Sequence, residues 1–101
     1  MSINVSPSFP GDGDAIFEFV QSNIRYPQDA LRERKEGDVY VRFTVMYDGT
    51  FNNVHVVRSS GVASLDAEAI RVVQSMPQWD PSTGIDKNKT WDNVIPVRFR
   101  L

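Results

Sequence analysis

Hydrophobic and polar residues alternate along the middle of the chain, between 37 and 60, in the period-2 pattern of a β-strand with one buried face. The apolar positions of the first half of this stretch are Val39, Val41, Phe43 and Val45. Asp48-Gly49 follows, and this pair favours a type I′ turn with positive φ at both central positions. The residues from 51 to 58 should therefore fold straight back, and we predict a β-hairpin that the other elements cover.

Helical spacing of apolar residues predicts two helices before this hairpin. The first begins near Asp12 or Asp14, since either side chain can cap it, and it ends near Tyr26 because a proline follows there. Pro27 suits the first position of the second helix, which is short. A charged stretch comes next, and Gly37 is the expected C-terminal stop.

One helix and one strand are predicted after the hairpin. Ser64 can cap this helix, acidic residues in its first turn favour the helix dipole, and Pro77 ends it. A polar loop follows, and Trp79 is its one large apolar anchor. Apolar and polar residues then alternate again from 93 to 101, which predicts the last strand.

The fold class that follows is α+β, with two N-terminal helices and then a strand, strand, helix, strand order. A right-handed crossover makes the second and last strands parallel to each other. We therefore expect a three-stranded antiparallel sheet with the first strand in the middle, helices over one face and two free edges. The uncovered face should carry Tyr40, Arg42, Thr44, Arg98 and Arg100.

The composition limits the kinds of site that the chain can form. Its 101 residues make one domain. The absence of cysteine excludes disulfides and thiolate metal sites, and a net charge of −2 gives no overall field for nucleic acid or an anionic membrane. No apolar run approaches the roughly 20 residues of a membrane span, and the first ten residues lack the features of a signal peptide. Any segment that carries the protein to a membrane is therefore expected to lie outside this chain.

The residues of this chain give little indication of a catalytic site or a metal site. His55 is the only histidine and lies within a strand, without obvious partners. Asp66 and Glu68 are explained by the electrostatics of a helix start. Gly11 and Gly13 do not follow a strand, so the context of a phosphate-binding loop is missing. We predict that the protein is not an enzyme and holds neither a cofactor nor a metal.

Nucleic-acid binding is an alternative that the uncovered sheet face suggests. Tyr40, Arg42, Arg98 and Arg100 could stack on and grip a single strand. The chain is net acidic, however, and only one of these residues is aromatic. An ordinary solvated strand face is the better interpretation, and we predict no nucleic-acid partner.

Several short motifs occur along the chain, spread over every predicted element. They are Tyr26-Pro27-x-x-Ala30, the alternating run from Gly37 to Val45, Asp48-Gly49, Leu65-Asp66-x-Glu68-Ala69, Met76-Pro77-x-Trp79-x-Pro81 and Pro96-Val97-x-Phe99. With these motifs in this order, residues 9–101 resemble the C-terminal domain of TonB-family energy transducers. Residues 1–8 would then be the stump of a linker.

The resemblance implies a place and a partner. Members of the family work in the periplasm of Gram-negative bacteria, anchored to the inner membrane by an N-terminal helix that this chain would lack, and complexed with motor proteins there. The C-terminal domain grips the N-terminal TonB box of outer-membrane transporters and transmits the pull that opens them. The alternative is a TonB-like interaction module of another envelope protein, such as a sensor or peptidase, that binds a different partner.

The resemblance also implies where the grip lies, on the last strand together with residues around Tyr26. The candidate partner-binding residues are Asn23, Arg25, Tyr26, Pro27, Val94, Pro96, Arg98 and Arg100. An edge strand offers main-chain donors and acceptors to an extended peptide. Pro96 should point its missing donor outward, so we expect a partner to pair best near Arg98. The same edges could allow a weak homodimer.

Overall fold

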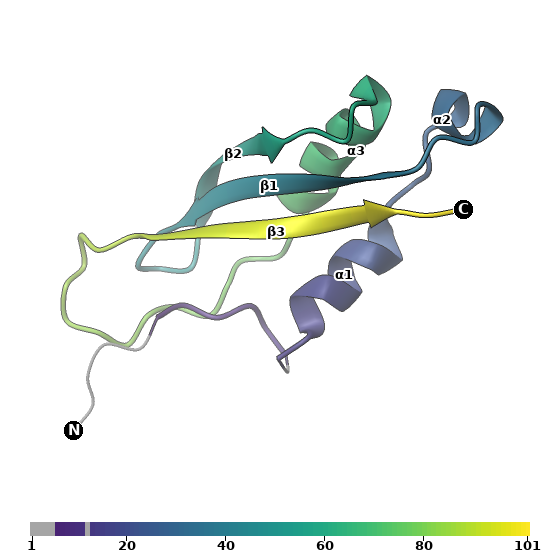
Figure 1. Ribbon diagram of the computed structural model, residues 1–101. Helices are drawn as coiled ribbons and strands as arrows, with labels where there is room; N and C mark the ends of the chain where they lie inside the picture. The colour runs from purple at the N-terminus through teal and green to yellow at the C-terminus, as the bar shows by residue number, and fades with distance from the viewer. Residues whose placement is uncertain (1–5, 12) are drawn as a thin grey trace.

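The computed structural model describes residues 6–11 and 13–101, and its elements follow the predicted order (Figure 1). They are α1 (Ala15–Asn23), α2 (Gln28–Arg32), β1 (Gly37–Val45), β2 (Phe51–Arg58), α3 (Ala63–Gln74) and β3 (Trp91–Phe99). The sheet order is β2-β1-β3, and β1 is antiparallel to both neighbours. The predicted α+β class and the central place of the first strand are confirmed.

The hydrophobic core lies between the sheet and the helices. The strand residues that face it alternate as the sequence predicts: Val39, Val41, Phe43 and Val45 on β1, and Ile95, Val97 and Phe99 on β3. α3 packs against β1 and β2, while α1 packs against β3 and α3. Trp79 comes from the loop after α3 and meets the ring of Phe43 at 5.7 Å between centroids. Trp79 therefore anchors its loop in the core, as expected.

The turn of the hairpin differs from the predicted type I′ turn. Only Gly49 has a positive φ, of 91°, whereas Asp48 does not. The Gly49 N–H donates to the Met46 carbonyl at 3.0 Å, which makes a three-residue loop ending in a left-handed glycine. A β-carbon on Gly49 would lie 2.0 Å from the carbonyl oxygen of Trp79. The turn is therefore shaped by the loop that packs against it as well as by its own two residues.

β2 also departs from a regular strand. Its pairing with β1 shifts between Arg42 and Thr44, where Asn53 adopts a left-handed φ of 58°. Such a bulge leaves one residue unpaired and increases the local twist. The simple alternation of apolar residues on β2 did not predict it.

α2 does not end at Gly37. Arg34 is the left-handed residue, with φ of 55°, and the Lys35 N–H donates back to the Ala30 carbonyl at 2.8 Å. This is the bond pattern of a Schellman C-cap, with arginine where glycine is usual. Gly37 instead opens β1, where a β-carbon would lie 3.0 Å from that of Ser60. Pro27 lies one residue before the helix rather than at its first position.

The expected helix caps are also replaced. Val62 occupies the N-cap position of α3, and the Ser64 hydroxyl has no hydrogen-bond partner among the described residues. The Asp66 carboxylate instead accepts hydrogen bonds from the Ser60 N–H at 2.9 Å and from the hydroxyls of Ser59 and Ser60. Asp66 therefore ties the end of the hairpin to α3.

Neither acidic residue expected to cap α1 can be assigned a capping bond. Asp14 precedes the helix without a side-chain cap bond, and Asp12 lies outside the described residues.

The expected linker, residues 1–8, is described only from residue 6 onward. Ser8 and Asp80 exchange two backbone hydrogen bonds, of 3.2 and 2.8 Å. The ring of Phe9 packs on Phe19 and Trp79. The chain thus packs against the domain from Ser8 or earlier. The domain boundary at residue 9 stays a prediction.

Replacement of Phe43 by alanine tests the register of β1. The side chain is fully buried, so we expect a loss of about 3 to 5 kcal/mol in the free energy of unfolding. A domain of this size has a total of roughly 5 to 15 kcal/mol, so the variant should be close to unfolding. Urea denaturation measures the change, and a loss below about 1 kcal/mol would contradict the register, because a slip of one residue exposes this position.

Candidate functional site

Among the residues that the structure describes, β3 forms one edge of the sheet, because β1 is the only strand paired with it. The pairing of the two strands runs without interruption from Gly37↔Phe99 to Val45↔Trp91. In such a ladder alternate residues of β3 turn their N–H and C=O away from β1. Arg98 is one of them, because both of its main-chain groups bond to α1 on the outer side.

The same alternation places the main-chain groups of Asp92, Val94 and Pro96 on the outer side of β3. Pro96 therefore directs its missing donor outward, as expected. Its carbonyl remains as an acceptor. The outer edge thus offers donors at Asp92 and Val94 but none at Pro96.

The expectation of a free donor and acceptor at Arg98 is wrong. The Arg98 N–H donates to Gln21 Oε1 at 3.1 Å, and Gln21 Nε2 donates to the Arg98 carbonyl at 3.1 Å. The side-chain amide of Gln21 thus occupies the place that a neighbouring strand would take. No pattern in the sequence singled out Gln21, since it is one polar residue on the exposed side of a helix.

Two hollows lie along the boundary between α1 and β3, and Phe17 lines both. One of about 210 Å³ is also lined by Trp79 and residues 93–95, and one of about 310 Å³ by Gln21, Pro96 and Arg98. Phe17 is 44% exposed and Val94 is 54% exposed. The β3 edge therefore combines main-chain groups with apolar surface.

The other candidate residues, in the connection from α1 to α2, are held to α3. The Arg25 N–H donates to Glu68 Oε2 at 2.6 Å, and Arg71 donates to the Asn23 carbonyl at 2.9 Å. Arg71 and Glu68 also form an ion pair of 2.7 Å. The Asn23 side chain bonds back to Phe19 within its own helix. Glu68 thus positions this connection, a role beyond the helix electrostatics that the sequence suggested.

Tyr26 links this connection to β3. Its ring meets Phe99 edge to face at 5.7 Å, and its hydroxyl donates to the Lys35 carbonyl at 2.5 Å. Burial raises the pKa of the phenol, and the nearby Glu36 carboxylate raises it further. Tyr26 is therefore a packed, neutral side chain, and its role in contacting a partner stays a prediction.

Contrary to expectation, Arg100 does not lie on the free edge. β3 ends at Phe99, and the Arg100 guanidinium pairs with Asp38 of β1 at 2.8 Å. By contrast, the Arg98 side chain has no ion pair or hydrogen bond among the described residues.

Most polar side chains on the uncovered face of the sheet contact other side chains of the same protein. Arg42 pairs with Asp92 at 2.6 Å, and the Thr44 hydroxyl donates to the same carboxylate. The Arg58 guanidinium lies 5.7 Å from the centre of the Tyr40 ring. Of the four residues that suggested nucleic-acid binding, only Arg98 lacks such a contact among the described residues. The arrangement does not favour a nucleic-acid groove.

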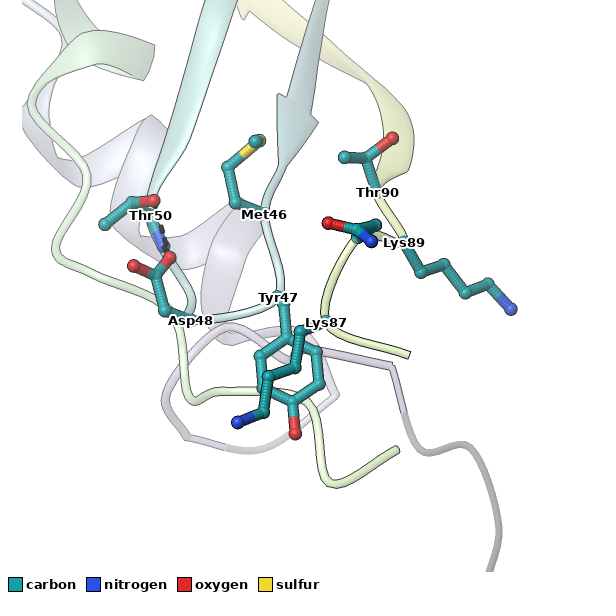
Figure 2. A pocket seen from close by; sticks show the side chains of 8 residues that line it. Met46, Tyr47, Asp48, Thr50, Lys87, Lys89 and Thr90 are labelled. Atoms are coloured by element: carbon teal, nitrogen blue, oxygen red, sulfur yellow. Dashed lines mark hydrogen bonds between the residues drawn. The ribbon is translucent and has the colours of Figure 1, made fainter. Parts of the chain in front are cut away.

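Another hollow, of about 360 Å³, lies beside the hairpin turn (Figure 2). Several of its polar lining groups are engaged within the protein: the Tyr47 hydroxyl donates to the Gly84 carbonyl at 2.6 Å, and the Asp48 carboxylate accepts from Thr50. Figure 2 shows the Lys89 ammonium pointing away from this hollow. The pocket therefore presents no converging set of reactive groups.

The part of the chain that the structure describes contains neither a candidate membrane-spanning helix nor a cluster of potential metal ligands. None of its helices has the length and apolar character to cross a bilayer. Within the same residues, no three histidine, cysteine, aspartate or glutamate side chains gather as a metal site would need.

A family of known proteins matches most of this chain. The sequence model described as "Gram-negative bacterial TonB protein C-terminal" matches residues 22–101. The chain belongs to this family. The resemblance noted in the sequence motifs is thereby confirmed.

Relatives and a solved structure agree with this assignment. The chain is 41% identical to Protein TonB of Haemophilus influenzae over 59 residues, which are 58% of the chain and 22% of that protein. It is 31% identical to Protein TonB of Haemophilus ducreyi over 81 residues, 80% of the chain and 28% of that protein. The NMR structure of the Helicobacter pylori TonB-CTD matches with a TM-score of 0.65 and 29% identity, covering 91% of this chain and 86% of that one. The chain thus spans only about a quarter of these full-length relatives.

Acid should weaken the domain partly through Glu68. Burial raises the pKa of this carboxyl, but hydrogen bonds from Arg71 and the Arg25 N–H outweigh burial and leave the pKa below its usual value. Its contribution to stability is therefore present above the ordinary pKa of 4.5 and is lost as the pH falls through the lower folded value. Glu68→Gln should be less stable at pH 7 and should lose less stability than the wild type between pH 7 and pH 3.

Urea denaturation at the two pH values measures this difference, with Glu18→Gln as the control. Glu18 lies in the first turn of α1, where it favours the helix dipole, but its side chain makes no bond among the described residues, so this variant should stay much closer to the wild type than Glu68→Gln does. An equal loss of stability on acidification in Glu68→Gln and in the wild type would mean that the Glu68 contacts do not persist in solution.

Proposed function

We propose that this domain binds the N-terminal TonB box of outer-membrane transporters as an added strand on the β3 edge, and that it transmits force for active uptake. Membership of the TonB C-terminal family supports the class of partner. The proposed mode of binding is supported by the outer side of β3, which has open main-chain groups and apolar surface beside them. The working site is the periplasm, with an inner-membrane anchor and motor proteins attached through another part of the protein.

Pairing by main-chain groups suits a domain that serves several transporters. The added strand is recognised by its peptide groups, so its sequence can vary. Asp92 and Val94 offer a donor and an acceptor each, and Pro96 offers only an acceptor, which makes five groups in all. At about 1 kcal/mol each they give roughly 5 kcal/mol, a Kd between about 0.1 and 1 mM.

Such an affinity is too low for main-chain pairing to act alone. Apolar contacts with Phe17 and with the hollow beside Val94 would add to it. The connection at Asn23, Arg25, Tyr26 and Pro27 is proposed as a further contact, since Tyr26 packs directly on the end of β3. Tethering of both proteins to the envelope would raise the effective concentration as well.

Replacement of Pro96 by valine tests the proposed edge. Valine restores an outward N–H, so a TonB-box peptide should bind about five times more tightly, as one added hydrogen bond implies. The same donor should increase self-association through the edge, which proline discourages. Titration of the isotope-labelled domain with the peptide, followed by NMR, measures affinity and location together, and sedimentation measures self-association.

Pro81→Val is the control, because Pro81 is an exposed loop residue outside the sheet. Pro81→Val should change neither the affinity for the peptide nor the self-association of the domain. If Pro96→Val remains folded and shows no rise in affinity or in self-association, the partner is held elsewhere than on β3. Chemical-shift changes confined to β2 or to the hairpin turn would lead to the same conclusion.

A further inference from the structure

The contact between Gln21 and Arg98 joins a helix side chain to the main chain of an edge strand. Both bonds measure 3.1 Å, and together they satisfy the donor and the acceptor of one residue. A carboxamide is a planar group that carries a carbonyl and an N–H, as a peptide unit does. Gln21 therefore stands in for one peptide group of a neighbouring strand.

The rest of the edge has no such cover. Among residues 6–11 and 13–101, no hydrogen-bond partner meets the outward main-chain groups of Asp92 and Val94. β3 is thus divided into an open part at Asp92–Val94 and a covered part at Arg98, with Pro96, which lacks a donor, between them.

The two hollows follow the same division. The smaller one lies beside residues 93–95, in the open part, and the larger one is lined by Gln21 itself together with Pro96 and Arg98. Side chains on one face of a strand recur every second residue, about 6.6 Å apart. Successive side chains of a docked strand that face α1 would therefore reach first the smaller hollow and then the larger one.

We propose that Gln21 is a displaceable cap on the partner site. A docked segment pairs first with Asp92–Val94 and reaches Arg98 only when its own peptide group replaces the amide of Gln21. The inference rests on the proposed function, because it assumes that the strand is added to β3. It also defines the partner more closely, as an extended segment with apolar side chains at positions i and i+2 facing α1.

The exchange at Arg98 is close to neutral in the wild type, since two hydrogen bonds break and two form. In a variant without the Gln21 amide, no hydrogen bond at Arg98 has to break before the strand docks. Both new hydrogen bonds then add to the free energy of binding. Gln21→Met keeps the length and helix preference of the side chain and removes both polar atoms. At about 1 kcal/mol for each of the two bonds, we expect this variant to bind a TonB-box peptide about 25 to 30 times more tightly than the wild type.

The experiment combines two measurements on wild type and Gln21→Met. Hydrogen exchange of the Arg98 amide in the free domain reports the cap without any peptide, and it should be faster in the variant. Titration with a synthetic TonB-box peptide of an outer-membrane transporter reports affinity. The matched control is Gln74→Met, the same replacement on α3, where the side chain is exposed and makes no hydrogen bond among the described residues.

Faster exchange at Arg98 together with tighter binding, both absent in Gln74→Met, supports the proposal. Unchanged exchange at Arg98 in a folded Gln21→Met overturns the cap. Faster exchange with unchanged or weaker binding overturns the displacement, because the strand then does not reach Arg98. If the peptide binds neither protein, the proposed function and the displacement both fail, while faster exchange in the variant still establishes the cap.

Discussion

The uninterrupted antiparallel pairing of β1 with β3 is the constraint on which the rest of the structure depends. It runs along all nine residues of β3 and gives the strand two distinct sides. Side chains at alternate positions, such as Val97 and Phe99, complete the core, while the main-chain groups of the residues between them point away from β1. A slip of one residue would bury the polar set and turn the other main-chain groups outward, so the core and the proposed partner edge depend on the same register.

The remaining elements hold and shape that edge. α1 packs beside β3 and contributes both Phe17 and Gln21, one apolar contact and one hydrogen-bonding amide. The connection after α1 is fastened to α3 through Glu68 and Arg71, and Tyr26 rests on Phe99. An edge strand with open donors tends to pair with other chains. Here Pro96 and the Gln21 amide reduce the number of open groups without closing the proposed partner site.

Much of this fold could be predicted from the sequence, because periodicity reports burial directly: the alternating residues of β1 and β3 are buried as expected. Features that depend on contacts between distant segments could not be predicted in this way. The turn at Gly49 is shaped by the Trp79 carbonyl, and the left-handed residue after α2 is Arg34 rather than a glycine. In the candidate site, the outward direction of Pro96 follows from alternation, but the bond from Gln21 to Arg98 spans 77 residues and leaves no local pattern. Arg100 was misplaced because the alternation of residue types continues after the pairing ends at Phe99.

Disulfide trapping tests the central claim, that a partner strand is added at the open part of β3. The chain has no cysteine, so single cysteines can be placed at Val94 on β3 and at Val57 on β2, two valines of similar exposure on strands at opposite edges of the sheet. Each variant is oxidised with TonB-box peptides that carry one cysteine at successive positions. Strand addition to β3 brings α-carbons within about 4.4 to 6.8 Å, so Val94→Cys should form disulfides with one or two peptide positions and Val57→Cys with none. Equal trapping at both sites, or trapping at Val57→Cys alone, would contradict the account.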